Sequence, residues 1–269
     1  MAQRTMEAHY LPNWNLTQAH GLLGYNCGFA ERRGCASFDE HQQALVWRVI
    51  GDTRIDGGTT VLDVGCGIGG PSTWMAQRFA PKRILSLEFC WSSVRAAHGR
   101  PGNGAARPRF MQGDAHHLPV GDGTIDVIFN LESALHYADK RRFLGECARA
   151  LRPGGTLCLG DITTSHKLLF APVSLLNSLP SQFNSNVTLW SAEDYRAAFA
   201  ENGLIVNHHE DAAEGVSHSL RDGLDEVRRR GWGNTRGFRG RILFLAALER
   251  LFRMGLLRYD LFRATRAGN

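Results

Sequence analysis

The sequence has few lysines, no long apolar run and no apolar leader. Only three of its 31 basic residues are lysines, so arginine supplies almost all of the positive charge. The longest apolar stretch, residues 242–252, is interrupted by Glu249 and Arg250, well short of the roughly 18 residues that a membrane-spanning helix needs. The first residues, MAQRTMEAHYLPNW, lack the apolar core of a signal peptide. We therefore expect a cytoplasmic protein without a membrane span.

The cysteines and histidines show no metal-ligand pattern. The six cysteines contain no Cys-x-x-Cys pair, as is typical of reduced thiols in a cytosolic protein. The histidines at 116–117 and at 208–209 are adjacent in sequence. Neighbouring side chains on a strand point to opposite faces, so neither pair can chelate an ion there. The sequence predicts no metal site.

The positive charge is concentrated late in the chain. The formal net charge is +5, and arginines crowd one stretch: 221, 228, 229, 230, 236, 239 and 241. A solvated helical face explains such a run, and the alternative is a surface for nucleic acid or another polyanion. No nucleic-acid-binding module lies beside these arginines. We therefore predict no nucleic-acid partner, and the role of the stretch stays open.

From residue 58 onward, short apolar runs alternate with amphipathic stretches. Near-continuous apolar strands separated by helices are typical of parallel strands that are buried on both faces and joined by crossover helices. The strands are expected in TTVLDVG, RILSLEF, PRFMQGD, TIDVIFN, GTLCLGD, LIVNHHED and, at the end, LLRYDLFRATR. Helices are expected at 39–50, 71–79 and 140–151 and after Ser191, which is a good N-cap.

The segments outside this alternation predict a cap on a single domain. We expect one domain over 1–269, with an N-terminal helical cap at 1–50 and a cofactor-binding core at 58–211. Residues 165–190 and 212–254 are read as substrate-side insertions, and 255–269 as the last strand. Long insertions at the strand ends of an α/β sheet usually build lids and substrate pockets.

The run VLDVGCGIGG (61–70) predicts a strand, a glycine turn and a helix start. Glycines permit positive φ and let a ligand approach the backbone. An acid about 20 residues further on can hold ribose hydroxyls, and Glu88 is so placed. Taken alone, this pattern serves a dinucleotide equally well.

The accompanying motifs narrow the choice. Asp63 stands two residues before the first glycine, and GDA (113–115), GDGTIDVIF (121–129) and LRPGGTL (151–157) follow. At these spacings the set resembles the class I S-adenosylmethionine-dependent methyltransferases. The resemblance implies a Rossmann-like α/β fold, with a seven-stranded, mostly parallel sheet whose last strand is antiparallel, a helical cap, and S-adenosylmethionine as cofactor.

The same resemblance assigns positions to the cofactor. Three glycines would face its methionine part, Glu88 would hold the ribose, Asp114 the adenine amino group, and Asp63 would support the turn. A finer similarity, in GYN (24–26), SFDEHQ (37–42) and LESALHYAD (131–139), points to enzymes that methylate small natural products, in which the Tyr25 segment closes over the cofactor. The expected cofactor residues are Tyr25, Asp63, Gly65, Cys66, Gly67, Gly69, Glu88, Phe89, Asp114, Ala115, Asn130 and Leu131.

The stretch LESALHY (131–137) carries the candidate acid–base groups. Methyl transfer to a hydroxyl needs a proton acceptor, and a histidine suits that role near neutral pH. His136 follows the fourth strand and Asp161 closes the fifth, so we expect them to meet as base and partner, as in the similar sugar O-methyltransferases. Glu132 favours a rival chemistry, C-methylation of an alkene, in which a carboxylate and aromatic side chains (Tyr10, Trp14, Phe183, Trp190) stabilise a cation.

The sequence predicts an enzyme of bacterial secondary metabolism that methylates a small-molecule acceptor, with O-methylation favoured over C-methylation. A more distant alternative is a protein that keeps the cofactor only as a scaffold. The identity of the acceptor stays open, as does N-methylation. A homo-oligomer is compatible with the sequence, and the oligomeric state stays open.

Overall fold

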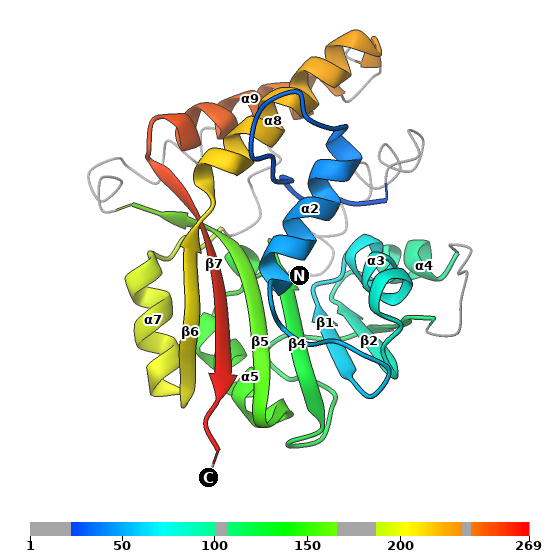
Figure 1. The fold of residues 1–269 in the computed structure, drawn as a ribbon, viewed down its shortest axis with the longest axis vertical. Coiled ribbons are helices and arrows are strands. Elements are labelled where there is room, and N and C mark those ends of the chain that lie inside the picture. Colours follow the sequence, from blue (N-terminus) through cyan, green and yellow to red (C-terminus); the bar gives the residue numbers. More distant parts are fainter. Residues whose placement is uncertain (1–22, 100–106, 166–186, 233–237, 269) are drawn as a thin grey trace.

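The computed structural model describes residues 23–99, 107–165, 187–232 and 238–268, and Figure 1 shows their arrangement. Seven strands form one sheet in the order β3-β2-β1-β4-β5-β7-β6. β7 is antiparallel to both β5 and β6, and the other neighbours pair in parallel. The predicted sheet is thereby confirmed. The strands are Thr60–Val64 (β1), Arg83–Glu88 (β2), Arg109–Gln112 (β3), Ile125–Leu131 (β4), Leu151–Thr164 (β5), Leu204–Asp211 (β6) and Leu257–Arg266 (β7).

Seven α-helices and one 3₁₀ turn lie in the described segments. They are Phe38–Ile50 (α2), Gly70–Phe79 (α3), Trp91–His98 (α4), Lys140–Ala150 (α5), Ala192–Glu201 (α7), Ala213–Arg229 (α8), Phe238–Arg253 (α9) and Ala134–His136 (η1). Helix α5 ends one residue earlier than predicted, because Leu151 already pairs with Ile125 as the start of β5. The predicted insertion at 212–254 contains α8 and α9, whereas most of 1–22 and 165–190 lies outside the described residues.

The sequence explains where several helices begin. Ser37 and Glu40 form a reciprocal capping box at the start of α2, and Ser191 and Asp194 form another at α7. The Asp139 side chain accepts a hydrogen bond from the backbone N–H of Arg142 at the start of α5, at 2.9 Å. These caps satisfy N–H groups that the first turn of a helix leaves without partners.

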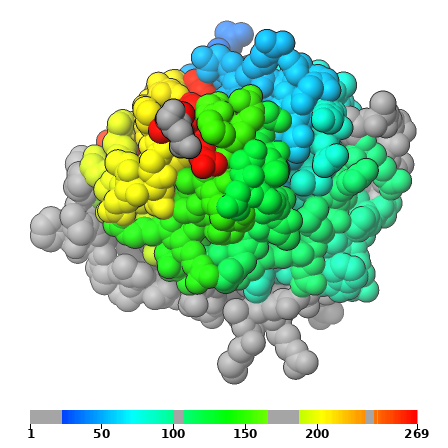
Figure 2. Space-filling view, turned by 90° about the horizontal axis from the view of Figure 1, so that it is seen from below, coloured from blue at the N-terminus to red at the C-terminus, as the bar shows by residue number. Residues whose placement is uncertain are grey.

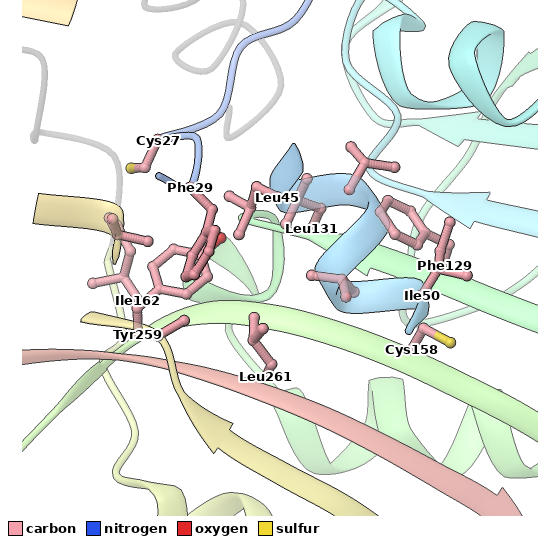
Figure 3. Close-up of a cluster of buried hydrophobic side chains, with 14 of the residues drawn as sticks. Cys27, Phe29, Leu45, Ile50, Phe129, Leu131, Cys158, Ile162, Tyr259 and Leu261 are labelled. Atoms are coloured by element: carbon pink, nitrogen blue, oxygen red, sulfur yellow. The ribbon is translucent and has the colours of Figure 1, made fainter. Parts of the chain in front are cut away.

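The sheet is covered on both faces, and the alternation of side chains along β5 separates the two cores. Cys158 and Ile162 join α2, α8 and α9 in one cluster, which Figure 3 shows in part. Leu157 and Leu159 join α5 and α7 in the other. Gly160 lets α2 pack closely, because a Cβ there would lie 2.8 Å from a methyl carbon of Val49. This alternation decides where the polar side chains at the strand ends point.

No helix of the described segments is both long and apolar enough to cross a membrane.

Candidate active site

The glycine turn after β1 is fixed to the neighbouring strand. Gly65, Gly67 and Gly69 have φ of 77°, 55° and 84°, which glycine adopts without strain. The backbone N–H groups of Gly65 and Cys66 both donate to the carbonyl of Leu87 in β2, at 2.8 and 3.0 Å. These two hydrogen bonds fix the turn that follows β1 to the carboxyl end of β2.

Two of these glycines make room for protein side chains. A Cβ on Gly65 would lie 1.9 Å from Ser133 Oγ, and one on Gly69 would lie 2.5 Å from the ring of Phe110. The backbone N–H of Gly67, in contrast, donates to Glu88 Oε2 at 2.9 Å. The first and third glycines thus pack the turn against its surroundings, while the middle one joins it to the acid at the end of β2.

Asp63 supports the turn from below. It is 1% exposed, and its Oδ2 accepts a hydrogen bond from Ser72 Oγ in α3 at 2.5 Å. Ser72 also contacts Ser86 of β2 at 2.8 Å. Burial raises the pKa of Asp63 to about 7. These contacts join β1, β2 and the first turn of α3.

Glu88 is oriented by two backbone donors. Its Oε2 accepts from Gly67, and its Oε1 accepts from the N–H of Cys90 at 2.9 Å. Burial raises the pKa of Glu88 despite these bonds. A carboxylate has about four lone-pair sites, so a carboxylate held in this way can still accept two hydroxyl donors such as those of a ribose.

A third acidic residue predicted to serve the cofactor, after Asp63 and Glu88, follows β3. Asp114 Oδ1 accepts from the backbone N–H of His116 at 2.9 Å and lies 2.6 Å from His116 Nδ1. Its side chain is 45% exposed. Ala115 beside it is buried, and Phe89, at the end of β2, is an exposed aromatic side chain. Asp114 is therefore both oriented and accessible to an amino group.

The two residues predicted at the end of β4 have buried side chains. Asn130 Nδ2 donates to the carbonyl of Val64 at 2.8 Å and to Tyr137 Oη at 3.1 Å. Leu131 belongs to the core beneath α2, near Leu45 (Figure 3). Asn130 thus joins the ends of β1 and β4, and any cofactor contact of this pair would come through the backbone.

The Tyr25 segment lies against the start of α3. A Cβ on Gly70 would lie 2.3 Å from the carbonyl oxygen of Leu23 and 3.1 Å from the Cα of Gly24. Gln42 Nε2 in α2 donates to the Asn26 carbonyl at 2.8 Å. The segment that the sequence predicts to close over the cofactor is therefore next to the glycine turn.

Glu132 joins this segment to the sheet. Its φ of 48° is left-handed, which is uncommon for a residue other than glycine. Its Oε1 accepts from the N–H of Cys27 and from Tyr259 Oη, both at 2.8 Å. Burial, together with the nearby Asp161 charge, raises the pKa of Glu132 to about 7 despite these hydrogen bonds. A carboxyl group that ionises near neutral pH thus stands at the end of β4.

The expected meeting of His136 and Asp161 is not formed. Asp161 is 0% exposed, and its Oδ2 accepts from Lys140 Nζ at 3.2 Å and from Tyr195 Oη at 2.5 Å. The strand ends do lie side by side, but Asp161 follows Leu157 and Leu159 on the face covered by α5 and α7. His136 is half-buried in η1, where its backbone N–H donates to the Ser133 carbonyl at 3.0 Å.

Four residues of this region were not among the predicted site residues: Tyr137, Lys140, Tyr195 and Tyr259. Tyr137 Oη lies 2.7 Å from Ser133 Oγ, beside the glycine turn. Lys140 and Tyr195 hold Asp161, and Tyr259 holds Glu132. The scarcity of lysine was a signal for Lys140, since a chain that uses arginine almost everywhere keeps a lysine here. No sequence signal distinguishes Tyr195 and Tyr259 from ordinary core residues.

A separate cleft of about 610 Å³ lies at the opposite edge of the sheet, near the amino ends of β1, β4 and β5. Figure 2 shows this side, with the C-terminal end of β7 in red. Its arginines are paired with acids, such as Arg263 with Asp52 at 3.1 Å. The cleft is on the far side of the sheet from the glycine turn. Within the described segments, no group of three or more His, Cys, Asp or Glu side chains is placed to hold a metal ion.

Residues 62–159 match the family model described as a methyltransferase domain. The erythromycin 3''-O-methyltransferase of Saccharopolyspora erythraea is 37% identical over 131 residues, which cover 48% of this chain and 43% of that protein. The 27-O-demethylrifamycin SV methyltransferase of Amycolatopsis mediterranei is 30% identical over 184 residues, 66% of each. The chain carries a class I S-adenosylmethionine-dependent methyltransferase domain.

Solved structures share the fold of this chain. The [4+2]-cyclase SpnF aligns with a TM-score of 0.78 at 22% identity, covering 100% of this chain and 97% of that one. A geranyl diphosphate C-methyltransferase from Streptomyces coelicolor, solved with S-adenosyl-L-homocysteine, aligns with a TM-score of 0.76 at 18% identity and covers 98% of each. These likenesses show the fold; together with the match to the methyltransferase domain family, they identify S-adenosylmethionine as the cofactor.

The chain spans less than half the length of the first curated relatives that it matches, 43% and 39%. The relatives therefore support the cofactor and the reaction type more strongly than any acceptor.

Proposed function

We propose that the protein transfers a methyl group from S-adenosylmethionine to a hydroxyl group of a small natural product in bacterial secondary metabolism. Two relatives bear names that place their methyl group on an oxygen of an antibiotic. The observation that carries the proposal is Glu132, a half-buried residue directly after β4 whose Oε1 is held by two donors and whose pKa is raised to about 7 by desolvation.

Different residues of the domain bind the cofactor and exclude water from it. The bound cofactor supplies an activated methyl group on a sulfonium. Glu88 and Asp114 hold the nucleoside through its hydroxyl and amino groups, and the N-terminal segment with Tyr25 excludes water from the methionine side. Exclusion of water and exact placement of the acceptor supply most of the rate, because the methyl donor is already reactive.

Glu132 accepts the hydroxyl proton. One of its oxygens is held by Cys27 and Tyr259, which fixes the direction of the other. A base whose pKa is near the working pH is both ionised in a large fraction of molecules and strong enough to take a proton. His136, four residues further along the chain, orients the acceptor or shares the proton. Asp161 pairs with Lys140. It therefore has no role here as the partner of His136.

The rival chemistry, C-methylation, has less support. Of the four aromatic side chains expected to stabilise a cation, Tyr10, Trp14 and Phe183 lie outside the described residues. Trp190 packs edge-on against Tyr195, with ring centroids 5.1 Å apart. Lys140 Nζ lies 5.7 Å from the centre of its ring. A tryptophan already in contact with a buried lysine is poorly suited to a second cation.

The test measures transfer of a labelled methyl group to a panel of macrolide and ansamycin alcohols. Glu132→Gln is expected to lower turnover by about 10²–10⁴-fold at unchanged cofactor affinity. In the wild type, turnover should fall as pH drops below about 7, because Glu132 becomes protonated. The turnover of the His136→Ala variant is measured in the same assay.

Glu201→Gln, at the exposed end of α7, is the matched control and should keep wild-type turnover. Normal turnover and an unchanged pH profile in the Glu132→Gln enzyme would show that Glu132 is not the base. Cofactor binding without transfer to any alcohol or alkene would favour the scaffold alternative.

A further inference from the structure

The net positive charge of the protein is concentrated in the stretch from the middle of α8 to the end of α9. Residues 221–253 contain nine arginines and four acidic residues, a net charge of +5, which equals that of the full chain. The remainder is therefore electrically balanced. A charge segregated in this way creates a local positive potential that the overall composition does not reveal.

The acids of this region leave several arginines without a partner. Asp222 and Asp225 pair with Arg33, which comes from outside the helices. Glu249 of α9 lies near Arg253 and, at 3.7 Å, near Arg221 of α8, so the two helices share it. Among the described residues, Arg229, Arg239 and Arg250 form no ion pair. All three are exposed.

Helix α9 carries apolar side chains on its outer face as well as on its inner face. Leu248 and Phe252 are buried in the core. On the other side, Leu243 is 64% exposed, and Met254, in the turn directly after α9, is 56% exposed. Leu243 and Met254 are two of the six large apolar side chains that are exposed in the described residues.

Helical spacing places these side chains on one stripe. Arg239, Leu243, Ala246 and Arg250 are separated by four, three and four residues, and Arg253 and Met254 follow at the next turn. Residues at such spacings share a face of an α-helix. The stripe therefore alternates positive and apolar side chains along the length of α9. We call this stripe, together with Arg228, Arg229 and Arg230 at the end of α8, the basic helical face.

We propose that the basic helical face docks on an anionic membrane surface. Helices that lie in the membrane interface combine arginines, which meet lipid phosphates, with apolar side chains that enter the acyl boundary. Leu243 and Met254 would enter between lipids, while Arg239 and Arg250 would contact their headgroups. Figure 1 shows α8 and α9 together at one end of the molecule, away from the C-terminus, where a flat surface can reach them.

A lipid surface fits this face better than a nucleic acid does. Binding to a phosphate backbone requires positive charge but gains little from Leu243 or Met254. The same helices also contact the site, because Ser219 Oγ of α8 donates to the Cys27 carbonyl at 2.8 Å. Docking through this face would therefore bring the segment beside the cofactor close to the membrane, where apolar acceptors collect.

The test is sedimentation of the full chain with vesicles of phosphatidylcholine alone or mixed with phosphatidylglycerol. The wild type should bind only the anionic vesicles and should be released by salt. Arg239→Gln/Arg250→Gln is expected to weaken binding about 30-fold. Leu243→Ser/Met254→Ser should weaken it about tenfold or more, because the apolar contribution is lost.

Two matched controls place the effect on this face. Arg83→Gln/Arg95→Gln removes two exposed arginines from β2 and α4, and Ile205→Ser removes a side chain on β6 that is 57% exposed. Both should bind vesicles like the wild type. Equal loss in the controls, no wild-type binding to anionic vesicles, or binding of duplex DNA or an acidic protein in place of vesicles would each overturn the proposal.

Discussion

Lys140 and Asp161 form a fully buried ion pair at the centre of the domain. Both side chains are 0% exposed, and Tyr195 completes the group from α7. Burial lowers the pKa of Lys140, and the Asp161 charge opposes that shift. A buried pair is weak evidence for net stability, but each partner is costly to leave alone. The group therefore specifies how α5, β5 and α7 meet.

Removing one partner of this ion pair is expected to lower the unfolding free energy more than it lowers the rate of methyl transfer. Asp161→Asn leaves Lys140 buried without a countercharge and should cost about 3–5 kcal/mol of unfolding free energy. Asp161→Leu/Lys140→Met removes both charges and should recover most of that loss. Urea unfolding measures all three proteins. If the Asp161→Asn protein has normal stability but no turnover, Asp161 acts in catalysis and not in holding the fold.

Asp63 predicts a pH dependence of stability. Its folded pKa of about 7 lies above the ordinary value near 3.8, so between these values the folded state holds more protons than the unfolded state. Its contribution is fully present below about pH 4 and is lost as pH rises through about 7, with a slope of up to about 1.4 kcal/mol per pH unit.

Asp63→Asn should flatten that slope while its amide oxygen keeps a hydrogen bond from Ser72. Urea unfolding at several pH values compares the variant with the wild type, and Asp52→Asn, at an exposed turn, serves as control. The same slope in wild type and Asp63→Asn would show that other groups carry the pH dependence.

At the scale of elements, the segment containing Tyr25 is held by several parts of the fold. Its Cys27 contacts β4 through Glu132 and α8 through Ser219. The backbone of Phe29 donates to the His41 carbonyl in α2 at 2.8 Å. A segment held from three sides costs little further entropy when it closes over a ligand.

Gly70→Ala tests that packing. The added Cβ would meet the Leu23 carbonyl at 2.3 Å, so the segment must move, while alanine suits the start of α3. We expect about tenfold weaker cofactor binding by calorimetry, with thermal stability nearly unchanged. Gly99→Ala, whose Cβ would have ordinary contacts of 3.6 Å or more, should bind normally. Unchanged binding by Gly70→Ala would separate the segment from the cofactor.

The elements themselves were readable from the sequence. Apolar runs and caps predict each strand and the starts of α2, α5 and α7, because local pattern and burial agree there. The alternation Leu157, Leu159, Asp161 was also readable, and it places Asp161 on a single face. Which helix covers that face depends on tertiary packing, so the contact with Lys140 could not be read from spacing. The left-handed backbone of Glu132 likewise has no sequence signal, because glycine or asparagine is the usual residue there.

On the scale of the whole molecule, the cofactor site and the rest of the fold are thermodynamically linked. A ligand that binds only the folded state raises its stability by RT ln(1 + [L]/Kd), about 2.7 kcal/mol at a hundredfold excess over Kd. We expect S-adenosylmethionine and its demethylated product to bind with about micromolar Kd and to raise the melting temperature accordingly.

Gly67→Val should abolish that rise, because its φ of 55° favours glycine and its N–H must reach Glu88. The strain of a β-branched residue at positive φ also destabilises the free protein. Gly203→Val supplies the matched control, since Gly203 has a φ of 68° and open space around it. Both variants should melt at lower temperature than the wild type, yet only Gly203→Val should regain stability when the cofactor is added. If Gly67→Val is stabilised by the cofactor as strongly as Gly203→Val, the glycine turn does not form the methionine side of the site.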